Sequence, residues 1–209
     1  MSGGDTRPAT AWFDMIYERA GDDENAVPWF AGVRPVFAEW LRRQPRADSM
    51  QRALVVGCGL GDDAEALANH GFAVTAFDVA PAAVAWCRQR FPQSAVQFVV
   101  ADLFAAPADW RQAFDFVLEI FTVQSLPIHL RGRTVASLAE FVAPGGALLA
   151  IAVGCEDAAR GLGPPWPLHR AEMDLFVAAG LVEEQFEILD VRRRDTFPKY
   201  RALYRRPAN

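Results

Sequence analysis

The residues best suited to do chemistry in this sequence are acids that directly follow a glycine-rich turn. Three glycines alternate in that turn: Gly57, Gly59 and Gly61. They follow an apolar run and precede Asp62 and Asp63, and the next apolar segment ends in Asp78. Glycine adopts positive φ at no steric cost and has no Cβ, so such a turn lets a ligand approach the backbone. A strand, a glycine-rich turn, a helix and an acid-tipped strand are typical of the nucleotide-binding half of an open α/β sheet.

The two adjacent aspartates indicate which nucleotide would bind. A dinucleotide places its pyrophosphate on the N-terminus of the helix after the turn, where the carboxylates of Asp62 and Asp63 would repel it. Asp62 also stands where the G-x-G-x-x-G motif has its third glycine. S-adenosylmethionine has no phosphate and carries a sulfonium and an ammonium, so the acidic turn favours this ligand over NAD. We expect one aspartate to cap the helix and the other to face the ligand.

Composition limits the class of protein. The chain has 209 residues, of which 52% are hydrophobic and 22% charged, as in a globular domain with a buried core. Its net charge of −5 argues against a nucleic-acid partner. No apolar run is long enough for a membrane span, and no signal segment is visible. The three cysteines lack metal-ligand spacing, which favours reduced thiols and a cytoplasmic location.

Strands and helices should alternate through the middle of the chain. Five apolar segments are predicted as strands, at residues 54–57, 74–77, 96–101, 114–120 and 147–153. Helices are predicted between them at 63–70, 82–91 and 126–142. Such alternation indicates a parallel sheet covered on both faces. A helix at 169–179 and two strands at 181–191 and 199–205 should follow, and the short basic link between these strands, 192–198, makes them antiparallel.

Before the first strand, aromatic residues recur at helical spacing. Helices should therefore begin near residue 11 and again near residue 36. We predict a single domain over residues 1–209. Residues 1–45 form its helical lid, and residues 46–209 form a Rossmann-like core that contains an insertion loop at 155–170.

Three motifs resemble those of class I S-adenosylmethionine-dependent methyltransferases. They are Pro28-Trp29, Gly57-x-Gly59-x-Gly61-x-Asp63 and Gly163-Pro164-Pro165-Trp166-Pro167-Leu168. Within that group the chain is most similar to the thiopurine and thiol S-methyltransferases and the tellurite-resistance methyltransferases. The resemblance implies a doubly wound seven-stranded sheet, mostly parallel with an antiparallel last strand. It also implies S-adenosyl-L-methionine as cofactor and S-adenosyl-L-homocysteine as product. After the fourth predicted strand the branch tends to have Asp-Arg, whereas this chain has Glu119-Ile120-Phe121-Thr122, which leaves the acceptor open.

The expected cofactor contacts follow the strand ends. The three glycines would admit the methionine portion, and Asp63 could reach its ammonium. Asp78 should accept the ribose hydroxyls, with Val79 beside the adenine. By resemblance Asp102 takes the adenine amino group and the amide of Leu103 faces the ring. The alternative for both Asp78 and Asp102 is to cap the helix that follows.

Other candidates lie nearer the transferable methyl. Glu119 could bind the cationic end of the cofactor or assist a proton, with a solvated rim acid as the alternative. Resemblance places Trp29 over the methionine end, where an aromatic face suits a sulfonium. The candidate walls of the acceptor pocket are Phe13, Tyr17, Phe121 and Trp166. The alternative for the aromatic residues is a place in the core, and His169 is expected to start a helix.

The sequence contains no metal-binding motif and no obvious general base. A thiol, with a pKa of about 8.5, needs less help to ionise than a phenol at about 10. A small-molecule thiol is therefore the first acceptor to consider, followed by oxygen or nitrogen. A non-catalytic protein that binds the cofactor and a nicotinamide-dependent oxidoreductase are the competing hypotheses.

Overall fold

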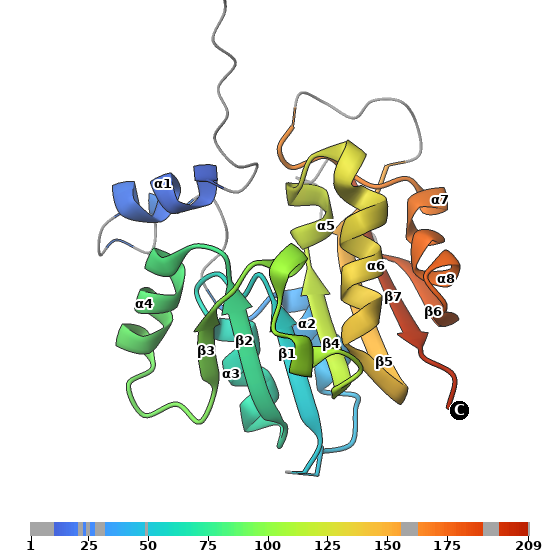
Figure 1. Cartoon of the computed structure of the whole chain (residues 1–209), viewed down its shortest axis with the longest axis horizontal. Coiled ribbons are helices and arrows are strands. Elements are labelled where there is room, and N and C mark those ends of the chain that lie inside the picture. Colours follow the sequence, from blue (N-terminus) through green and yellow to red (C-terminus); the bar gives the residue numbers. More distant parts are fainter. Residues whose placement is uncertain are drawn as a thin grey trace, which may run out of the picture.

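The computed structural model describes residues 11–20, 23, 26–27, 32–48, 50–155, 163–189 and 197–208. A seven-stranded sheet in the order β3-β2-β1-β4-β5-β7-β6 forms its centre (Figure 1). The strands are β1 (Arg52–Val56), β2 (Ala73–Asp78), β3 (Gln97–Val100), β4 (Phe114–Ile120), β5 (Val142–Val153), β6 (Val182–Leu189) and β7 (Lys199–Arg205). The first five are parallel, and β7 runs antiparallel to both β5 and β6. The predicted fold class is confirmed.

Helices cover both faces of this sheet (Figure 1). They are α1 (Ala11–Ala20), α2 (Pro35–Leu41), α3 (Asp62–Asn69), α4 (Pro81–Arg90), α5 (Thr122–Ser125), α6 (Arg131–Phe141), α7 (Arg170–Met173) and α8 (Leu175–Ala178). Short 3₁₀ turns occur at Leu103–Ala105, Ala108–Trp110 and Ile128–Leu130.

The surroundings of β1 explain why its residues 53–56 are all apolar. Leu54 and Val56 belong to the core cluster that includes α6 and α8, whereas Ala53 and Val55 belong to the cluster that includes α2, α3 and α4. Successive side chains of a strand point to opposite faces, and here both faces are covered. In β1 a polar side chain therefore has room only at the end of the strand, where the exposed Arg52 lies.

Two predicted boundaries were wrong. The helix predicted over 126–142 begins at Arg131, because Leu126 precedes Pro127 and adopts an extended conformation with ψ 152°. Strand β5 begins at Val142 and not at residue 147, with a register shift against β4. The backbone groups of Gly145 and Gly146 there pair with Arg206, so the glycines that were expected only to end a helix lie inside a strand.

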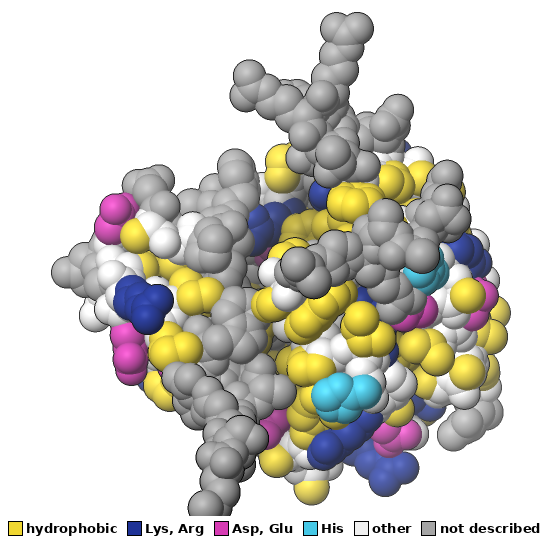
Figure 2. All heavy atoms as spheres, turned by 90° about the horizontal axis from the view of Figure 1, so that it is seen from above, with side chains coloured by type: hydrophobic (Ala, Val, Ile, Leu, Met, Phe, Trp, Pro, Cys, Tyr) yellow, Lys and Arg dark blue, Asp and Glu magenta, His cyan; other side chains and the backbone are white. Residues whose placement is uncertain are grey.

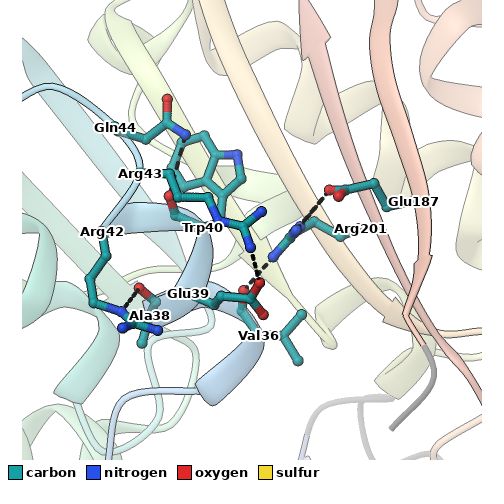
Figure 3. A network of polar contacts seen from close by, with 9 residues as sticks. All are labelled: Val36, Ala38, Glu39, Trp40, Arg42, Arg43, Gln44, Glu187 and Arg201. Atoms are coloured by element: carbon teal, nitrogen blue, oxygen red, sulfur yellow. Dashed lines mark hydrogen bonds and ion pairs between the residues drawn. The ribbon is translucent and has the colours of Figure 1, made fainter.

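The buried guanidinium of Arg201 joins α2 to the edge strands β6 and β7 (Figure 3). This β7 side chain is 2% exposed. It donates to the carbonyl oxygen of Val36 at 2.8 Å and to Glu187 of β6 at 2.8 Å. A buried charge with two such partners is costly to remove. The other ion pair in Figure 3, Arg43 with Glu39, is exposed and lies within the helical segment itself.

Within the described part of the chain, every helix is too short or too polar to cross a lipid bilayer.

Candidate functional site

The glycine turn between β1 and α3 lies at the carboxyl end of the parallel strands. Gly57, Gly59 and Gly61 all have positive φ, at 60°, 54° and 88°. A Cβ on Gly57 would lie 2.8 Å from Oγ1 of Thr122, and that hydroxyl donates to the carbonyl oxygen of Val56 at 3.2 Å. The turn is therefore pressed against the first residue of α5, and Gly57 cannot gain a side chain without displacing it.

Gly61 faces the core beneath the turn. A Cβ there would lie 3.0 Å from Sγ of Cys87, 3.1 Å from the ring of Phe98 and 3.2 Å from that of Phe91. The thiol of Cys87 donates to the carbonyl oxygen of Gly59 at 3.1 Å. The sequence interpretation assigned all three glycines to ligand approach. Packing of α4 and β3 against the turn is a sufficient reason for the third.

The prediction that Asp62 or Asp63 caps α3 was wrong. The residue at the N-cap is Gly61, in the left-handed conformation and without a side-chain cap. Capping requires the side chain of the residue that precedes the first turn, and both aspartates lie inside that turn. Their charges still complement the positive end of the helix dipole.

The two aspartates have different partners. Asp62 forms a bidentate ion pair with Arg90, at 2.8 and 3.1 Å. Asp63 accepts a hydrogen bond from the backbone N–H of Arg34 at 2.8 Å. Burial raises the pKa of Asp63 to about 6, and the backbone and guanidinium of Arg34 oppose that rise. The segment before α2 is therefore bonded to the first turn of α3, directly after the glycine turn. The contact of Asp63 with a cofactor ammonium stays a prediction.

Asp78, at the end of β2, holds the turn from the other side. Its Oδ2 accepts from the N–H of Gly59 and its Oδ1 from that of Ala80, both at 3.0 Å. The carboxyl is 7% exposed. Burial raises its pKa, and the hydrogen bonds from Ala80, Gly59 and Val79 oppose that rise. A carboxylate offers about four lone-pair sites, so these bonds leave acceptor capacity for ribose hydroxyls, which remains the predicted role.

Asp102 follows β3 and is exposed. Its Oδ1 accepts from the N–H of Phe104 at 2.8 Å and caps the turn Leu103–Ala105, so the capping alternative is confirmed. Leu103 itself is 8% exposed. The half-buried Val79 directly follows Asp78. The adenine contacts of these residues stay predictions.

Glu119 is not the solvated rim acid that one alternative supposed. It pairs with Val56 across β4 and β1 and is 1% exposed. One oxygen accepts from the N–H of Val123 at 3.0 Å. Burial raises its pKa to about 7, against the opposing hydrogen bonds from Val123 and Thr122. An acid with such a pKa can hold or release a proton near neutral pH.

The four candidate pocket walls fall into two groups. Phe121 and Trp166 lie beyond the ends of β4 and β5, where the N–H of Phe121 bonds to Ile151 and that of Trp166 to the carbonyl oxygen of Gln124. Tyr17 of α1 is buried against α4, and its ring lies edge-to-face with that of Trp86 at 5.9 Å between the ring centroids. Phe13 packs against the hydrophobic cluster to which Tyr17 and Trp86 belong. The core alternative is confirmed for Tyr17.

Trp29 and the arginines at 192–194 lie outside the described residues. The expectation for His169 is confirmed. It is the residue before α7, and its backbone N–H donates to the carboxylate of Glu172 at 2.8 Å.

Among the residues that the structure describes, no group of three or more His, Cys, Asp or Glu side chains is placed to hold a metal ion.

Sequence reasoning missed four polar residues at this edge. They are Arg34, Thr122, Gln124 and Lys199. Gln124 is 2% exposed and accepts from the N–H of Val153 at 2.6 Å. Ligands bind beyond the carboxyl ends of parallel strands, and this rule led to Glu119. Thr122 and Gln124 closely follow the same predicted strand, so the rule could have identified them as well. Arg34 and Lys199 gave no local signal.

Comparison with known proteins gives a family match over part of the chain. The methyltransferase domain family matches residues 53–146. The ubiquinone biosynthesis O-methyltransferase of Azotobacter vinelandii is 29% identical over 123 residues, which is 59% of this chain and 45% of that protein. The chain therefore matches less than half the length of this relative.

Solved structures show a similar fold. The [4+2]-cyclase SpnF has a TM-score of 0.76 at 17% identity and 97% coverage of both chains. The N-methyltransferase NodS of Bradyrhizobium japonicum, in complex with S-adenosyl-L-homocysteine, has 0.72 at 18% identity, with 95% and 98% coverage. The 1,6-didemethyltoxoflavin-N1-methyltransferase of Burkholderia thailandensis has 0.71 at 20% identity, with 95% and 87% coverage.

At these identities the similarity concerns the fold, and a cyclase among the matches illustrates that fold does not decide chemistry. Residues 53–146 match the methyltransferase domain family, and the chain has the fold of the class I S-adenosylmethionine-dependent methyltransferases.

Proposed function

We propose that the chain is a methyltransferase that uses S-adenosyl-L-methionine, releases S-adenosyl-L-homocysteine and methylates a small molecule. One observation carries the proposal. The positive-φ glycine turn is held by the acid at the end of the next strand, Asp78, at 3.0 Å from the N–H of Gly59. This unit lies within the residues that match the methyltransferase domain family. The small-molecule methyltransferases of similar fold support the class of substrate.

The residues around the turn fit this cofactor. Since Arg90 neutralises Asp62, the argument against a pyrophosphate depends on Asp63 and Asp78, which are buried acids and would repel it. Gly57 and Gly59 would lie along the methionine portion and Asp78 would accept the ribose hydroxyls. Val79, Asp102 and Leu103 would contact the adenine, and Trp29 the sulfonium end. When bound, the cofactor supplies an electrophilic methyl on a positively charged sulfur.

Within this proposal Glu119 holds the proton that the acceptor loses. A base with a pKa of about 7 takes a proton from a thiol of pKa about 8.5 at a cost of about 2 kcal/mol, and from a phenol at about 10 for about 4 kcal/mol. A thiol is therefore the first acceptor to test, in line with the thiol S-methyltransferase resemblance. The buried position of Glu119 excludes bulk water from the carboxyl, which supports a proton-holding role over a solvated one.

Oxygen is the second candidate for the acceptor atom. It is favoured by the similarity of residues in this chain to an O-methyltransferase of ubiquinone biosynthesis. A protein that binds the cofactor without transferring its methyl is the candidate from another class, since a cyclase shares the fold. A cytoplasmic location also belongs to the proposal, because all three cysteines are free thiols.

The test is the formation of S-adenosyl-L-homocysteine by the purified chain. It is incubated with S-adenosyl-L-methionine and a panel of aryl thiols, alkyl thiols, phenols and amines, and products are identified by mass spectrometry. The proposal expects methylated thiol above the no-enzyme rate, and loss of most product with Asp78→Asn. Methylation of phenols alone would refute the thiol acceptor. Cofactor binding without product across the panel would favour the non-catalytic alternative.

A further inference from the structure

Phe121 directly follows β4, the strand that pairs with β1 and so lies next to the predicted cofactor turn. Phe121 follows β4 with φ 65°, a conformation that is uncommon outside glycine and is often found at functional sites. Its N–H donates to the carbonyl oxygen of Ile151 in β5 at 2.9 Å. The next residue, Thr122, is the one that touches Gly57. The main chain therefore fixes residue Phe121 beside the turn, two residues after Glu119.

Two cations from opposite ends of the chain approach this ring. The guanidinium carbon of Arg34 lies 5.9 Å from the ring centroid, and Nζ of Lys199 lies 6.0 Å from it. Viewed onto the end of the molecule at which the parallel strands finish, basic side chains lie among hydrophobic ones near the middle of the face (Figure 2).

The two cations have different surroundings. Arg34 is joined to α3 through its backbone bond to Asp63, and the charges of Asp62 and Asp63 act on its guanidinium. Lys199 begins β7 and pairs with Val153, the last residue of β5. In the strand order, β5 and β7 lie beyond β4 as seen from β1. Lys199 therefore starts from the β5–β7 side of Phe121, and the predicted cofactor turn after β1 lies on the other side.

Lys199 is also unusual in composition. It is the only lysine in a sequence whose other basic residues, apart from three histidines, are arginines. A lysine offers a compact ammonium with three donors on a flexible stem. Next to the apolar face of Phe121, such a group suits a ligand that has a flat apolar body and an anionic end.

We propose that Lys199 selects acceptors that carry a carboxylate, with the apolar body of the acceptor against Phe121 and its reacting atom toward Glu119. The inference rests on the proposed methyl transfer and names the class of substrate for that site. A charge-assisted contact of this kind should favour a carboxylate acceptor over its neutral counterpart by about tenfold or more.

The experiment compares matched acceptors in the complex with S-adenosyl-L-homocysteine. Calorimetry measures binding of 4-mercaptobenzoate against thiophenol, and of 4-hydroxybenzoate against phenol, to the wild-type chain, Lys199→Met and Lys199→Arg. We expect the carboxylate member of at least one pair to bind tenfold tighter to the wild type. Lys199→Met should remove this preference for the carboxylate and leave the affinities for the neutral acceptor and for S-adenosyl-L-homocysteine unchanged. Lys199→Arg should keep part of the preference.

A second measurement uses the single lysine directly. Acetylation of Lys199 by an amine-specific reagent, followed by peptide mass spectrometry, should slow when 4-mercaptobenzoate is present and not when thiophenol is. Equal binding of both members of each pair would overturn the inference, as would a loss of S-adenosyl-L-homocysteine affinity in Lys199→Met, which would make the cofactor the anionic partner. Failure of the wild type to bind S-adenosyl-L-homocysteine at all would instead refute the proposed function.

Discussion

The carboxylate of Asp78 accepts a hydrogen bond from the backbone N–H of Gly59 at 3.0 Å. The acid that ends β2 and the middle glycine of the turn after β1 therefore form one structural unit. The second oxygen of the same carboxylate fixes Ala80, which precedes α4. A single side chain thus determines the shape of the turn and offers the remaining acceptor sites to a ligand.

Replacement of Asp78 should weaken cofactor binding more than it weakens the fold. Asp78→Asn keeps one carbonyl oxygen for either Gly59 or Ala80 but would lose the charge-assisted bonds that we propose Asp78 makes to ribose hydroxyls. We expect affinity for S-adenosyl-L-homocysteine to fall by about tenfold to a hundredfold, or about 1.5–3 kcal/mol. Titration calorimetry measures this affinity for the wild type and for the variant. Asp102→Asn, at an exposed cap, is the comparison, and unchanged affinity in Asp78→Asn would exclude the ribose assignment.

A side chain at Gly57 should destabilise the protein by two separable effects. Gly57→Ala combines φ 60° with a Cβ that would lie 2.8 Å from Oγ1 of Thr122. We expect a loss of about 3 kcal/mol in the free energy of unfolding, of which backbone strain accounts for about 1–2 kcal/mol. Gly180→Ala is the matched control, since its φ is 89° and nothing lies within 4 Å of the new Cβ.

The pair Gly57→Ala and Thr122→Ala tests the contact itself. In the double variant the hydroxyl is gone, so the overlap is relieved and only backbone strain remains. Denaturant unfolding of the four proteins in this cycle gives the coupling. An additive cycle would show that the turn does not press on Thr122.

The ionisation of Glu119 should make stability depend on pH. Its folded pKa of about 7 lies above the ordinary value of 4.5. Protonated Glu119 therefore contributes stability that is complete below pH 4.5 and is lost as pH rises through 7. Glu119→Gln stays neutral and keeps an oxygen for the N–H of Val123. The free energy of unfolding of Glu119→Gln should thus equal that of the wild type near pH 4.5 and exceed it by up to about 3 kcal/mol above pH 7.

Urea unfolding from pH 4.5 to pH 8.5 measures that difference. Asp63, whose pKa is also raised, to about 6, is present in both proteins, so its contribution cancels in the comparison. Parallel stability curves for the wild type and Glu119→Gln would show that Glu119 ionises normally and could not hold an acceptor proton near neutral pH.

Loss of Arg201 should loosen α2 and, through it, the glycine turn. Arg201→Met removes the donors to Val36 and Glu187, and we expect a loss of about 2–4 kcal/mol in the free energy of unfolding. Hydrogen exchange should rise in α2 and at Arg34, whose N–H bonds to Asp63. Arg43→Met removes the exposed ion pair with Glu39 and should cost less than about 1 kcal/mol. Equal effects of the two substitutions would contradict this account.

The parallel sheet and the position of the acids at its edge were predictable because they follow general rules. Alternating apolar segments indicate a parallel sheet, and acids that end its strands must meet at one edge. That reasoning placed Asp78 and Glu119 correctly at the carboxyl ends of β2 and β4.

The roles of Asp62, Asp63 and Lys199 depend on contacts distant in sequence. The cap of α3 was mispredicted because Gly61 takes the N-cap in a left-handed conformation, which leaves Asp62 to Arg90. The burial of Glu119 has no local signal, since it depends on the strands β1 and β5 on either side of β4. The approach of Arg34 and Lys199 to Phe121 has none either, since it requires segments from both ends of the chain.

The central claim is that the acidic glycine turn binds S-adenosylmethionine and not a dinucleotide. Titration calorimetry of the purified chain with S-adenosyl-L-homocysteine and with NAD tests it most directly. The account predicts saturable binding of S-adenosyl-L-homocysteine at one ligand per chain, weakened by Asp78→Asn, and no binding of NAD under the same conditions. Tight binding of NAD without binding of S-adenosyl-L-homocysteine would contradict it.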